Sequence, residues 1–345
     1  MKISIYAGNL LPLHAQILDE RPLGGTETGV VRLAQKLKDL GHQVRVYTSS
    51  ENPPASDPQY LPLREIEKSE PIDVFISVRD WIPLFYRVPA KKRFFWTGDS
   101  YDQFSNYGLG DHRVIQQVDY FLAVSDWQAD QICSRSGFPR EKVYKLKNGI
   151  EWDWFSEQLP KKTKRLIYSS TPYRGLQYVP PMYRWLHEKL PDIELSVFSS
   201  YKIYNQTQDF EPLKREIESL PNTRIQESIL QRDLAKEFLK SKVLFYPCHF
   251  EETSCITAIE AMAAGCVPLS THLGALPETI GDAGVLIEGQ ASEASYVQKF
   301  LEACLDLLTN EERFSDLSQK GRARARQHDW KSIAKDFDQF LRSLL

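Results

Sequence analysis

Two carboxylates eight positions apart give this sequence its clearest chemical signal. Glu252 lies in the polar segment 251–255, and Glu260 lies in the apolar segment that follows. Apolar residues recur there at helical spacing, so the first acid is expected just ahead of a helix and the second within it. Ser254 is the expected N-cap of this helix. Free backbone N–H groups at a helix start bind phosphate well, so the segment is a candidate phosphate site.

A pair of glycines near the N-terminus marks a second candidate site. Residues 2–7 alternate as a strand, a long loop ends in Gly24-Gly25-Thr26, and a helix is expected from there to Leu40. With the strand at 44–48 this makes a strand–helix–strand unit, which indicates a parallel sheet. Gly-Gly ahead of a helix lets the backbone approach a negative ligand, although such a loop is also an ordinary turn.

The second half of the chain repeats the order strand, loop, helix. An expected strand ends in Ser169-Ser170, and Arg174 follows in the loop before a helix. A guanidinium can engage phosphate oxygens bidentately. The alternative is a surface arginine, but the helix dipole disfavours a cation at a helix start, and bound phosphate would explain one there.

The stretch around Glu252 resembles the E-x7-E signature of the GT4 family of retaining glycosyltransferases, which have the GT-B fold. That family usually reads E-G-F-G-L-x-x-x-E-A-M-A-x-G-x-P. The positions that fall in register are Glu252, Glu260, Ala261, Met262, Ala263, Gly265 and Pro268. Thr253-Ser254-Cys255 replaces the usual Gly-Phe-Gly. The resemblance covers nearly the whole chain and is strongest over residues 243–284.

The resemblance implies that the chain binds a nucleotide sugar. Glu252 would hydrogen-bond the sugar hydroxyls and Glu260 the ribose hydroxyls. Arg174 stands at the position of a phosphate-binding lysine, while Ser169 or Ser170 stands where the family usually has an arginine. Ser228 and Ile229 correspond to the loop that reads the base. The expected donor contacts are Gly24, Gly25, Thr26, Ser169, Ser170, Arg174, Ser228, Ile229, Thr253, Ser254, Cys255, Ile256 and Glu260.

The acceptor side of the resemblance departs from the family. Gly98 stands where relatives often have a histidine, and Asp99 keeps the place of the acid that follows it. Asp99 is therefore the candidate for orienting the acceptor hydroxyl or assisting proton transfer. An equal alternative is that Asp99 caps the next helix. The expected catalytic residues are Glu252, Asp99 and Arg174.

The fold expected from the resemblance is α/β, with two Rossmann-like domains whose parallel sheets face each other across a cleft. Residues 1–160 would form the acceptor-binding domain and residues 161–327 the nucleotide-sugar-binding domain. A C-terminal helix in residues 328–345 would cross back to the N-terminal domain. The basic residues 161–165 are the expected linker between domains, and residues 51–62 an expected surface loop.

Composition limits the partners. The 345 residues carry a net charge of -3, which argues against nucleic acid. Five scattered cysteines without C-x-x-C spacing favour a reducing compartment, with no disulfide framework or zinc site. We expect a cytoplasmic protein. Basic and aromatic residues interleave over 85–95, which leaves peripheral contact with the inner face of a membrane open. A solvated loop leading into a core strand explains that segment better.

The resemblance implies a retaining transfer of a hexose, with UDP-glucose, the commonest donor of relatives, as the first choice, to a glycan or lipid-linked acceptor. UDP-galactose, UDP-N-acetylglucosamine and GDP-mannose are further options. No cofactor or metal is expected, because cationic side chains and helix dipoles would stabilise the leaving diphosphate. Asp336 and Asp338 match the D-x-D metal-binding signature of a different class of glycosyltransferase. Here the two residues lie on an amphipathic helix, outside the usual context of that signature, so a metal site is not expected. The alternatives are a GT-B epimerase acting on a UDP-sugar and a non-catalytic sugar-nucleotide-binding protein.

Overall fold

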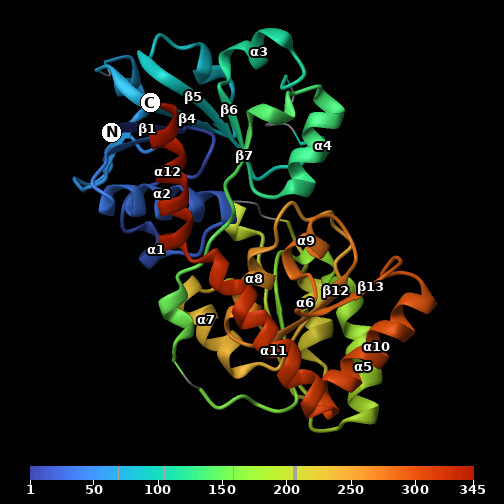
Figure 1. The fold of residues 1–345 in the computed structure, drawn as a ribbon. Coiled ribbons are helices and arrows are strands. Elements are labelled where there is room, and N and C mark those ends of the chain that lie inside the picture. The colour runs from blue at the N-terminus through green and yellow to red at the C-terminus, as the bar shows by residue number, and fades with distance from the viewer. Residues whose placement is uncertain (69, 104–105, 107, 158, 205–207) are drawn as a thin grey trace. The chain divides into compact units, whose positions relative to one another are not determined.

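The chain folds into two compact units. Unit 1 holds Met1–Gly149 and Trp330–Leu345, and unit 2 holds Ile150–Asp329. The computed structural model describes residues 1–68, 70–103, 106, 108–157, 159–204 and 208–345, and Figure 1 shows their helices and strands. The boundary expected after residue 160 differs from this division, because Phe155 is fully buried in the core of unit 2. The return to unit 1 begins at Trp330 rather than at residue 328.

Unit 1 is built on a seven-stranded sheet in the order β3-β2-β1-β4-β5-β6-β7. Its neighbouring strands are parallel throughout, as helical crossovers require. The strands are β1 Lys2–Ala7, β2 Gln43–Thr48, β3 Gln59–Pro62, β4 Ile72–Val78, β5 Ala90–Trp96, β6 Tyr120–Ala123 and β7 Val143–Lys145. The helices are α1 Ile17–Glu20, α2 Gly25–Asp39, α3 His112–Gln117, α4 Asp126–Ser136 and α12 Trp330–Leu344, with short 3-10 helices η1 Leu63–Lys68, η2 Ile82–Phe85 and η4 Arg140–Lys142.

Unit 2 is built on a six-stranded parallel sheet in the order β10-β9-β8-β11-β12-β13. The strands are β8 Arg165–Ser169, β9 Glu194–Phe198, β10 Thr223–Gln226, β11 Val243–Tyr246, β12 Val267–Thr271 and β13 Val285–Ile287. The helices are α5 Val179–Lys189, α6 Glu211–Glu218, α7 Gln231–Lys240, α8 Ile256–Ala263, α9 Leu276–Ile280, α10 Ala294–Thr309 and α11 Glu311–Ala325. The 3-10 helices are η5 Trp152–Phe155, η6 Pro172–Arg174, η7 Leu176–Tyr178, η8 Lys202–Tyr204 and η9 Arg326–His328.

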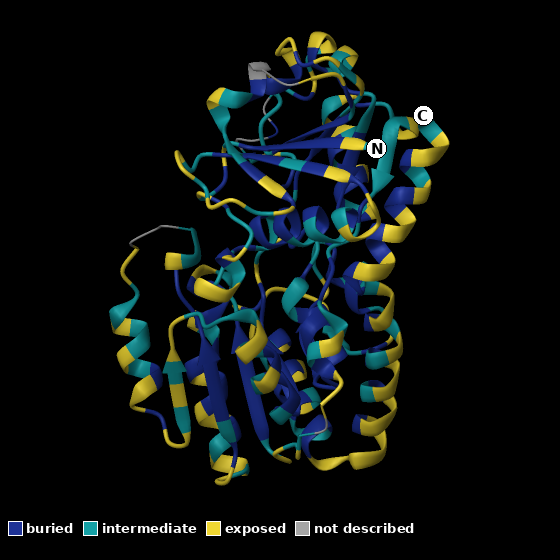
Figure 2. Cartoon of the chain, turned by 90° about the vertical axis from the view of Figure 1, so that its left-hand side faces the viewer, coloured by how far each residue is buried: buried dark blue, intermediate teal, exposed yellow. Residues whose placement is uncertain are grey.

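The central strands of both sheets are largely buried, as expected for parallel sheets covered on both faces: β4 is buried at six of its seven positions and β11 at all four, whereas the edge strand β10 has no buried residue. Figure 2 shows the strands mostly in the buried colour and the exposed colour mainly on the outer sides of helices and on loops. The C-terminal helix α12 belongs to unit 1, as expected, because Trp330 and Phe337 join its core. The Phe337 ring meets the Phe94 ring of β5 edge-on, with 6.2 Å between centroids.

Two segments expected to be irregular contribute to strands, one entirely and the other through its last residue. Residues 59–62 form β3 and pair with β2, because Tyr60 is buried there. Pro62 is tolerated since β3 is the edge strand. The basic run 161–165 is not a free linker: Arg165 opens β8, is 3% exposed and bonds to Ser196 Oγ. Local composition resembled loops at both places, and tertiary burial overrode it.

The start of the helix that carries Glu260 also differs from the expectation. Helix α8 begins at Ile256 with Cys255 as its N-cap residue, and no side chain caps it. Ser254 therefore precedes the N-cap position instead of occupying it. Ser125, by contrast, does cap α4 with its side chain, which accepts a hydrogen bond from Gln128 N.

Candidate active site

Arg174 and Glu252 form an ion pair at the carboxyl ends of two neighbouring strands. Strands β8 and β11 lie side by side in the middle of the unit 2 sheet, although β9 and β10 separate them in sequence. The winding of the chain reverses between them, and open α/β sheets bind ligands at such a point. The loops that follow the two strands meet there. Arg174 Nη1 lies 2.7 Å from Glu252 Oε1 and 2.9 Å from Oε2.

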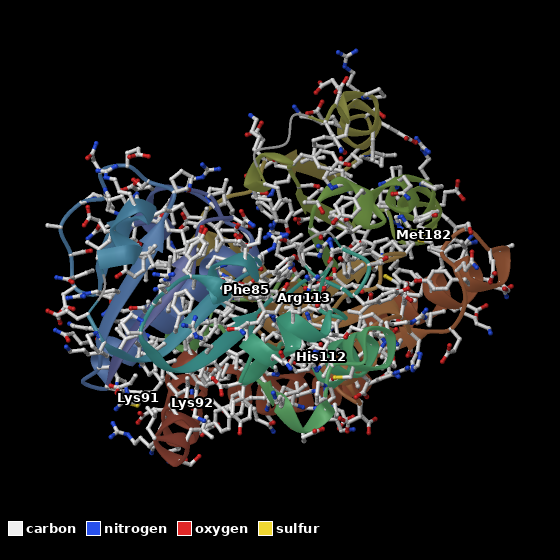
Figure 3. All side chains as sticks on the ribbon, turned by 90° about the horizontal axis from the view of Figure 1, so that it is seen from above. Phe85, Lys91, Lys92, His112, Arg113 and Met182 are labelled. Atoms are coloured by element: carbon white, nitrogen blue, oxygen red, sulfur yellow. The ribbon has the colours of Figure 1, made fainter. Side chains whose placement is uncertain are left out.

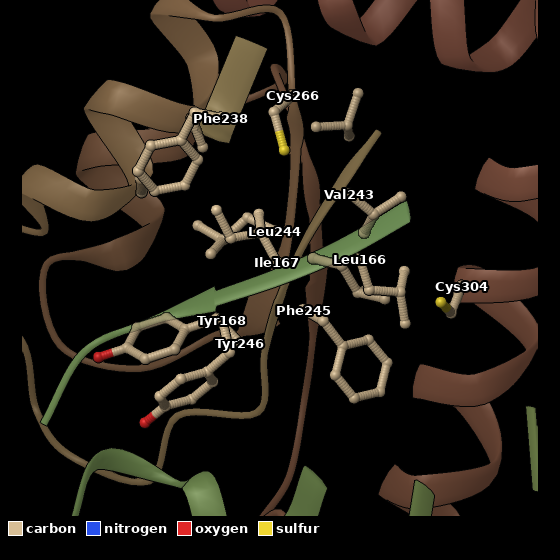
Figure 4. Packing of buried hydrophobic residues seen from close by; sticks show 14 of the residues in the cluster. Leu166, Ile167, Tyr168, Phe238, Val243, Leu244, Phe245, Tyr246, Cys266 and Cys304 are labelled. Atoms are coloured by element: carbon tan, nitrogen blue, oxygen red, sulfur yellow. The ribbon is translucent and has the colours of Figure 1, made fainter. Parts of the chain in front are cut away.

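A buried tyrosine holds the Glu252 carboxylate from the other side. Tyr246, the last residue of β11, donates its hydroxyl proton to Glu252 Oε1 at 2.6 Å, and Ser170 Oγ lies 3.3 Å from the same hydroxyl. Burial, followed by the nearby Cys248 and Glu252, raises the pKa of Tyr246, so the hydroxyl remains a donor. Figure 4 shows Tyr168 and Tyr246 with their hydroxyl oxygens on the same side of the hydrophobic cluster.

Arg174 is fixed by aromatic rings as well as by Glu252. Its guanidinium carbon lies 4.6 Å from the Phe250 ring centroid and 5.5 Å from that of Tyr173, within the range of cation–π attraction. Its Nε donates to the Tyr173 hydroxyl at 3.2 Å. Burial alone would lower the pKa of Arg174, but the charge interactions with Glu252 and with nearby tyrosines together outweigh it, and the pKa is raised well above its usual value. In the described part of the chain Nη2 has no hydrogen bond, so it can serve a ligand anion.

Two glycines allow the loops around this ion pair to close. Gly175 follows Arg174 with φ 108°, and a Cβ at Gly175 would lie 2.2 Å from the Pro247 carbonyl oxygen. Gly274 has φ 59°, and a Cβ there would lie 2.7 Å from the Glu252 carbonyl oxygen. Neither position can hold a side chain without moving backbone, so both glycines set the geometry of Arg174 and Glu252.

We expect Gly175→Ala to destabilise unit 2 by about 3 kcal/mol or more, because the new methyl strikes backbone as well as forcing an alanine into the left-handed region. Gly289→Ala is the matched control. Gly289 has φ 109°, but its added Cβ would meet only the end of the Glu293 side chain, at 2.9 Å. That variant should lose only about 1 kcal/mol. Urea unfolding measures both, and equal losses would contradict the assignment of Gly175 to this close contact.

Glu260 lies one turn inside α8 and is 3% exposed. Its Oε1 accepts a hydrogen bond from Gln231 Nε2 at 2.8 Å, which ties α8 to the first residue of α7. Burial raises the pKa of Glu260 to about 8, with Gln231 opposing part of that effect. The carboxyl is therefore protonated at neutral pH in the unliganded protein, so it can donate as well as accept a hydrogen bond.

The other expected donor contacts in unit 2 surround this core. The Ser169 carbonyl accepts from Thr257 Oγ1 at 2.9 Å, which joins the end of β8 to the first turn of α8. Thr253, Ser254 and Cys255 lead into α8, whose first residue is Ile256, and Thr253 and Cys255 are buried. Ser228 and Ile229 lie in the loop between β10 and α7. All these segments follow the carboxyl ends of strands.

In unit 1 the structure pairs Asp99 with a residue that sequence reasoning missed. Asp99 is 8% exposed, and its Oδ2 accepts from Arg79 Nε at 2.7 Å. Arg79 follows β4 with φ 54°, an uncommon value for a non-glycine residue. The next α-helix in the described part of the chain, α3, begins at His112 and is capped by Asp111 rather than by Asp99.

The Gly24-Gly25-Thr26 loop lies beside the Asp99 loop within unit 1. Gly24 is the N-cap residue of α2, so Gly25 already belongs to the helix. A Cβ at Gly98 would lie 3.3 Å from Thr26 Oγ1, so a larger residue at 98 would crowd the helix start. Burial raises the pKa of Glu27 in the first turn of α2, with Arg79 and Asp99 as charged neighbours.

Three residues of these clusters were not singled out from the sequence. Tyr246 ends an apolar strand, and only the need of a buried hydroxyl for a partner could have marked it. Gln231 opens a helix on which it looks like any polar surface residue. Arg79 follows a strand directly, and parallel strands present such residues at the ligand edge of a sheet. That rule would have placed Arg79 near Asp99.

The D-x-D of the last helix has structural partners. Asp338 Oδ1 lies 2.7 Å from His42 Nε2, and Arg342 Nε donates to the same carboxylate. Phe337 belongs to the core of unit 1. The D-x-D is therefore not part of the ion-pair site.

Glu278 follows β12 and contributes its backbone to a structural contact, because its carbonyl accepts a hydrogen bond from Arg324 Nη2.

The basic and aromatic segment 85–95 is divided by the fold. Arg93 turns inward and donates to the carbonyls of Leu84 and Val88 at 2.8 and 2.6 Å. Lys91 pairs with Asp73. Figure 3 shows Phe85 well apart from Lys91 and Lys92, so these residues do not form one surface patch. This arrangement fits a solvated loop entering a core strand.

Among the described residues, no helix combines the length and apolar character that membrane crossing requires.

The structure is similar to solved glycosyltransferase structures over nearly its whole length. A glycosyltransferase from Rickettsia africae matches with a TM-score of 0.74 and 12% identity, covering 99% of this chain and 98% of that one. Alr3699/HepE from Anabaena, solved in complex with UDP-glucose, matches with a TM-score of 0.74 and 13% identity, covering 99% of this chain and 100% of that one. At these identities the likeness establishes the fold, which is GT-B.

Sequence comparison reaches the same class. A curated relative, the MMP alpha-(1->4)-mannosyltransferase of Mycolicibacterium hassiacum, is 24% identical over 226 residues, which are 64% of this chain and 53% of the relative. The chain thus spans about half the length of that relative. The family model for glycosyl transferases group 1 matches residues 152–324, half of the chain and nearly all of unit 2. The chain belongs to the glycosyl transferases group 1 family.

Proposed function

We propose that this protein is a retaining glycosyltransferase that moves a hexose from a UDP-sugar, most simply UDP-glucose, to a glycan or lipid-linked acceptor. The observation that carries the proposal is the Arg174–Glu252–Tyr246 cluster at the point where the unit 2 sheet reverses its winding. A cation with an available donor next to a fixed carboxylate suits a phosphorylated sugar, since one group meets phosphate and the other meets hydroxyls.

The chemistry follows from where charge develops. As the glycosidic bond breaks, negative charge grows on the leaving β-phosphate. Arg174 Nη2 and the backbone N–H groups at the start of α8 would stabilise it, as would the Gly24-Gly25 amides of unit 1. Glu252 would hold the sugar hydroxyls and Glu260 the ribose. Because these groups supply the positive charge, the proposed reaction uses no metal.

Retention is proposed through a front-side displacement. The acceptor hydroxyl would attack on the face that the diphosphate leaves, and the leaving phosphate oxygen would take its proton. Asp99, held by Arg79, would orient that hydroxyl. Glu252 is occupied by Arg174 and Tyr246, which suits a group that fixes the sugar better than a covalent nucleophile.

Two comparisons support the choice of donors to test. HepE, with the same fold, binds UDP-glucose. The mannosyltransferase relative makes GDP-mannose the second donor to test. A polysaccharide or envelope acceptor, with peripheral contact at the cytoplasmic face of a membrane, completes the proposal.

The test is the product released from each donor in the presence of EDTA, followed by proton NMR from the first minutes. Slow hydrolysis of UDP-glucose should release α-glucose first, because water replaces the acceptor on the retained face. Release of β-glucose first would contradict retention. Formation of an isomeric UDP-sugar would indicate an epimerase instead. Binding without cleavage of UDP-glucose, UDP-galactose, UDP-N-acetylglucosamine or GDP-mannose would favour a non-catalytic binding protein.

A further inference from the structure

Tyr173 is an exposed aromatic residue whose ring is nevertheless held in place by several contacts. It precedes Arg174 in η6, and 39% of the residue is accessible. Yet the ring is held on several sides. It stacks on Tyr201 at 9° with 6.3 Å between centroids, it meets Phe250 edge-on at 5.6 Å, and its hydroxyl accepts from Arg174 Nε. An exposed ring that is already ordered loses little entropy when a ligand stacks on it.

The ring belongs to a row that crosses the ligand edge of the unit 2 sheet. Phe250 follows β11, Tyr173 follows β8, and Tyr201 follows β9. Phe210 continues the row ahead of α6, edge-on to Tyr201 at 5.9 Å. Three of these four rings therefore lie at the carboxyl ends of adjacent strands, where parallel sheets bind their ligands. Arg174 lies at the Phe250 end of the row.

The strand order gives the row a direction. Strand β9 lies between β8 and β10, so a ligand that extends from Arg174 to the loop after β10 passes the end of β9. Tyr201 stands there with Tyr173 stacked on it. Lys202 and Glu227, which form an ion pair, join the loops after β9 and β10. If Arg174 binds the phosphates of a nucleotide, the base of that nucleotide would thus lie against the Tyr173 ring.

We propose that Tyr173 is a stacking platform for the base of the nucleotide donor, and this inference rests on the proposed function. Arg174 would take the diphosphate while Tyr173, its neighbour in sequence, takes the π-face of the base. A stacking contact is tolerant of base identity, since every base presents a π-face. The platform therefore contributes affinity for UDP and GDP alike, and the choice between them must come from other contacts.

The test compares UDP, UMP, pyrophosphate and glucose 1-phosphate as ligands of the full chain, by calorimetry or by competition. Tyr173→Ala should raise the dissociation constants of UDP and UMP about 10-fold. It should leave those of pyrophosphate and glucose 1-phosphate within about twofold, because they have no base. Tyr173→Phe keeps the ring but loses the hydroxyl that Arg174 Nε contacts, so any loss of affinity should be shared by all four ligands and not be selective for UDP and UMP.

Trp185→Ala is the matched control. Trp185 is an aromatic residue of α5 in the same unit with similar exposure, 36%, away from the row. This variant should leave all four dissociation constants unchanged. Equal weakening of UDP and pyrophosphate in Tyr173→Ala would mean that the ring acts through Arg174, and unchanged UDP affinity would remove the platform. Selective weakening of glucose 1-phosphate would assign the ring to the hexose. If the wild type binds neither UDP nor GDP, the proposed function fails and the inference with it.

Discussion

Replacing Glu252 by glutamine is expected to lower donor turnover about 100-fold or more, the usual effect of losing one preorganised polar group that acts on the transition state. The carboxylate accepts from Arg174 Nη1 and from the Tyr246 hydroxyl, and it is 4% exposed. Glutamine keeps the shape but removes the charge and one acceptor oxygen. UDP affinity is expected to hold or rise, because Arg174 loses its partner and becomes more available to phosphate. Steady-state kinetics and calorimetry measure the two effects separately.

Tyr246→Phe is the companion variant. It removes one neutral hydrogen bond to Glu252 without changing the charge of the site, so a loss of about 10-fold is expected. The two variants should not be additive, since both act through the same carboxylate. An account in which Glu252 merely closes a structural ion pair predicts something else. Both variants would then unfold more readily, and the folded fraction would turn over the donor at the wild-type rate.

A second large effect is expected in the pH dependence of stability. Glu260 has an ordinary pKa of 4.5 in the unfolded chain and a pKa of about 8 in the folded one, because it is buried. Below pH 4.5 both states are protonated. Between pH 4.5 and 8 the unfolded chain ionises while the folded protein does not, so the free energy of unfolding falls as pH rises. The slope reaches about 1.4 kcal/mol per pH unit, and the whole fall is of the order of 5 kcal/mol.

Glu260→Gln isolates this contribution, because the other titrating groups remain in both proteins. Urea unfolding at pH 5, 6, 7 and 8 should find the variant and the wild type similar at pH 5. The variant should be increasingly the more stable of the two toward pH 8. Glu251→Gln, an exposed carboxyl in the same loop as Glu252, should follow the wild type throughout. Parallel curves for Glu260→Gln and wild type would mean that Glu260 ionises freely in the fold.

Much of the fold could be predicted from periodicity. Alternation of apolar strands with amphipathic helices predicted two parallel sheets. The return of α12 to unit 1 followed from the resemblance and is confirmed by Trp330 and Phe337 in the core. Residues 59–62 were missed as a strand because a polar, proline-rich segment gave no local sign of burial.

The site could be predicted as a set of residues but not as a set of contacts. Arg174 and Glu252 are 78 residues apart, and they meet only because β11 inserts next to β8. Sequence spacing says nothing about that strand order. The Glu252 carboxylate was expected to hydrogen-bond sugar hydroxyls, whereas in the unliganded protein it is already bound by Arg174 and Tyr246. The N-cap was expected at Ser254 but is Cys255, one residue later. Helix ends depend on local backbone geometry, so the sequence locates them only to within one or two residues.

Calorimetric titration of UDP, GDP, UDP-glucose and GDP-mannose into the wild type and Arg174→Ala, without divalent metal, tests the donor site most directly. UDP and UDP-glucose should bind the wild type. Arg174→Ala should weaken both by about 10- to 100-fold, the range for losing charge-assisted hydrogen bonds to phosphate. If no nucleotide binds the wild type, or if Arg174→Ala binds UDP equally well, then the Arg174–Glu252 cluster is not a metal-independent donor site.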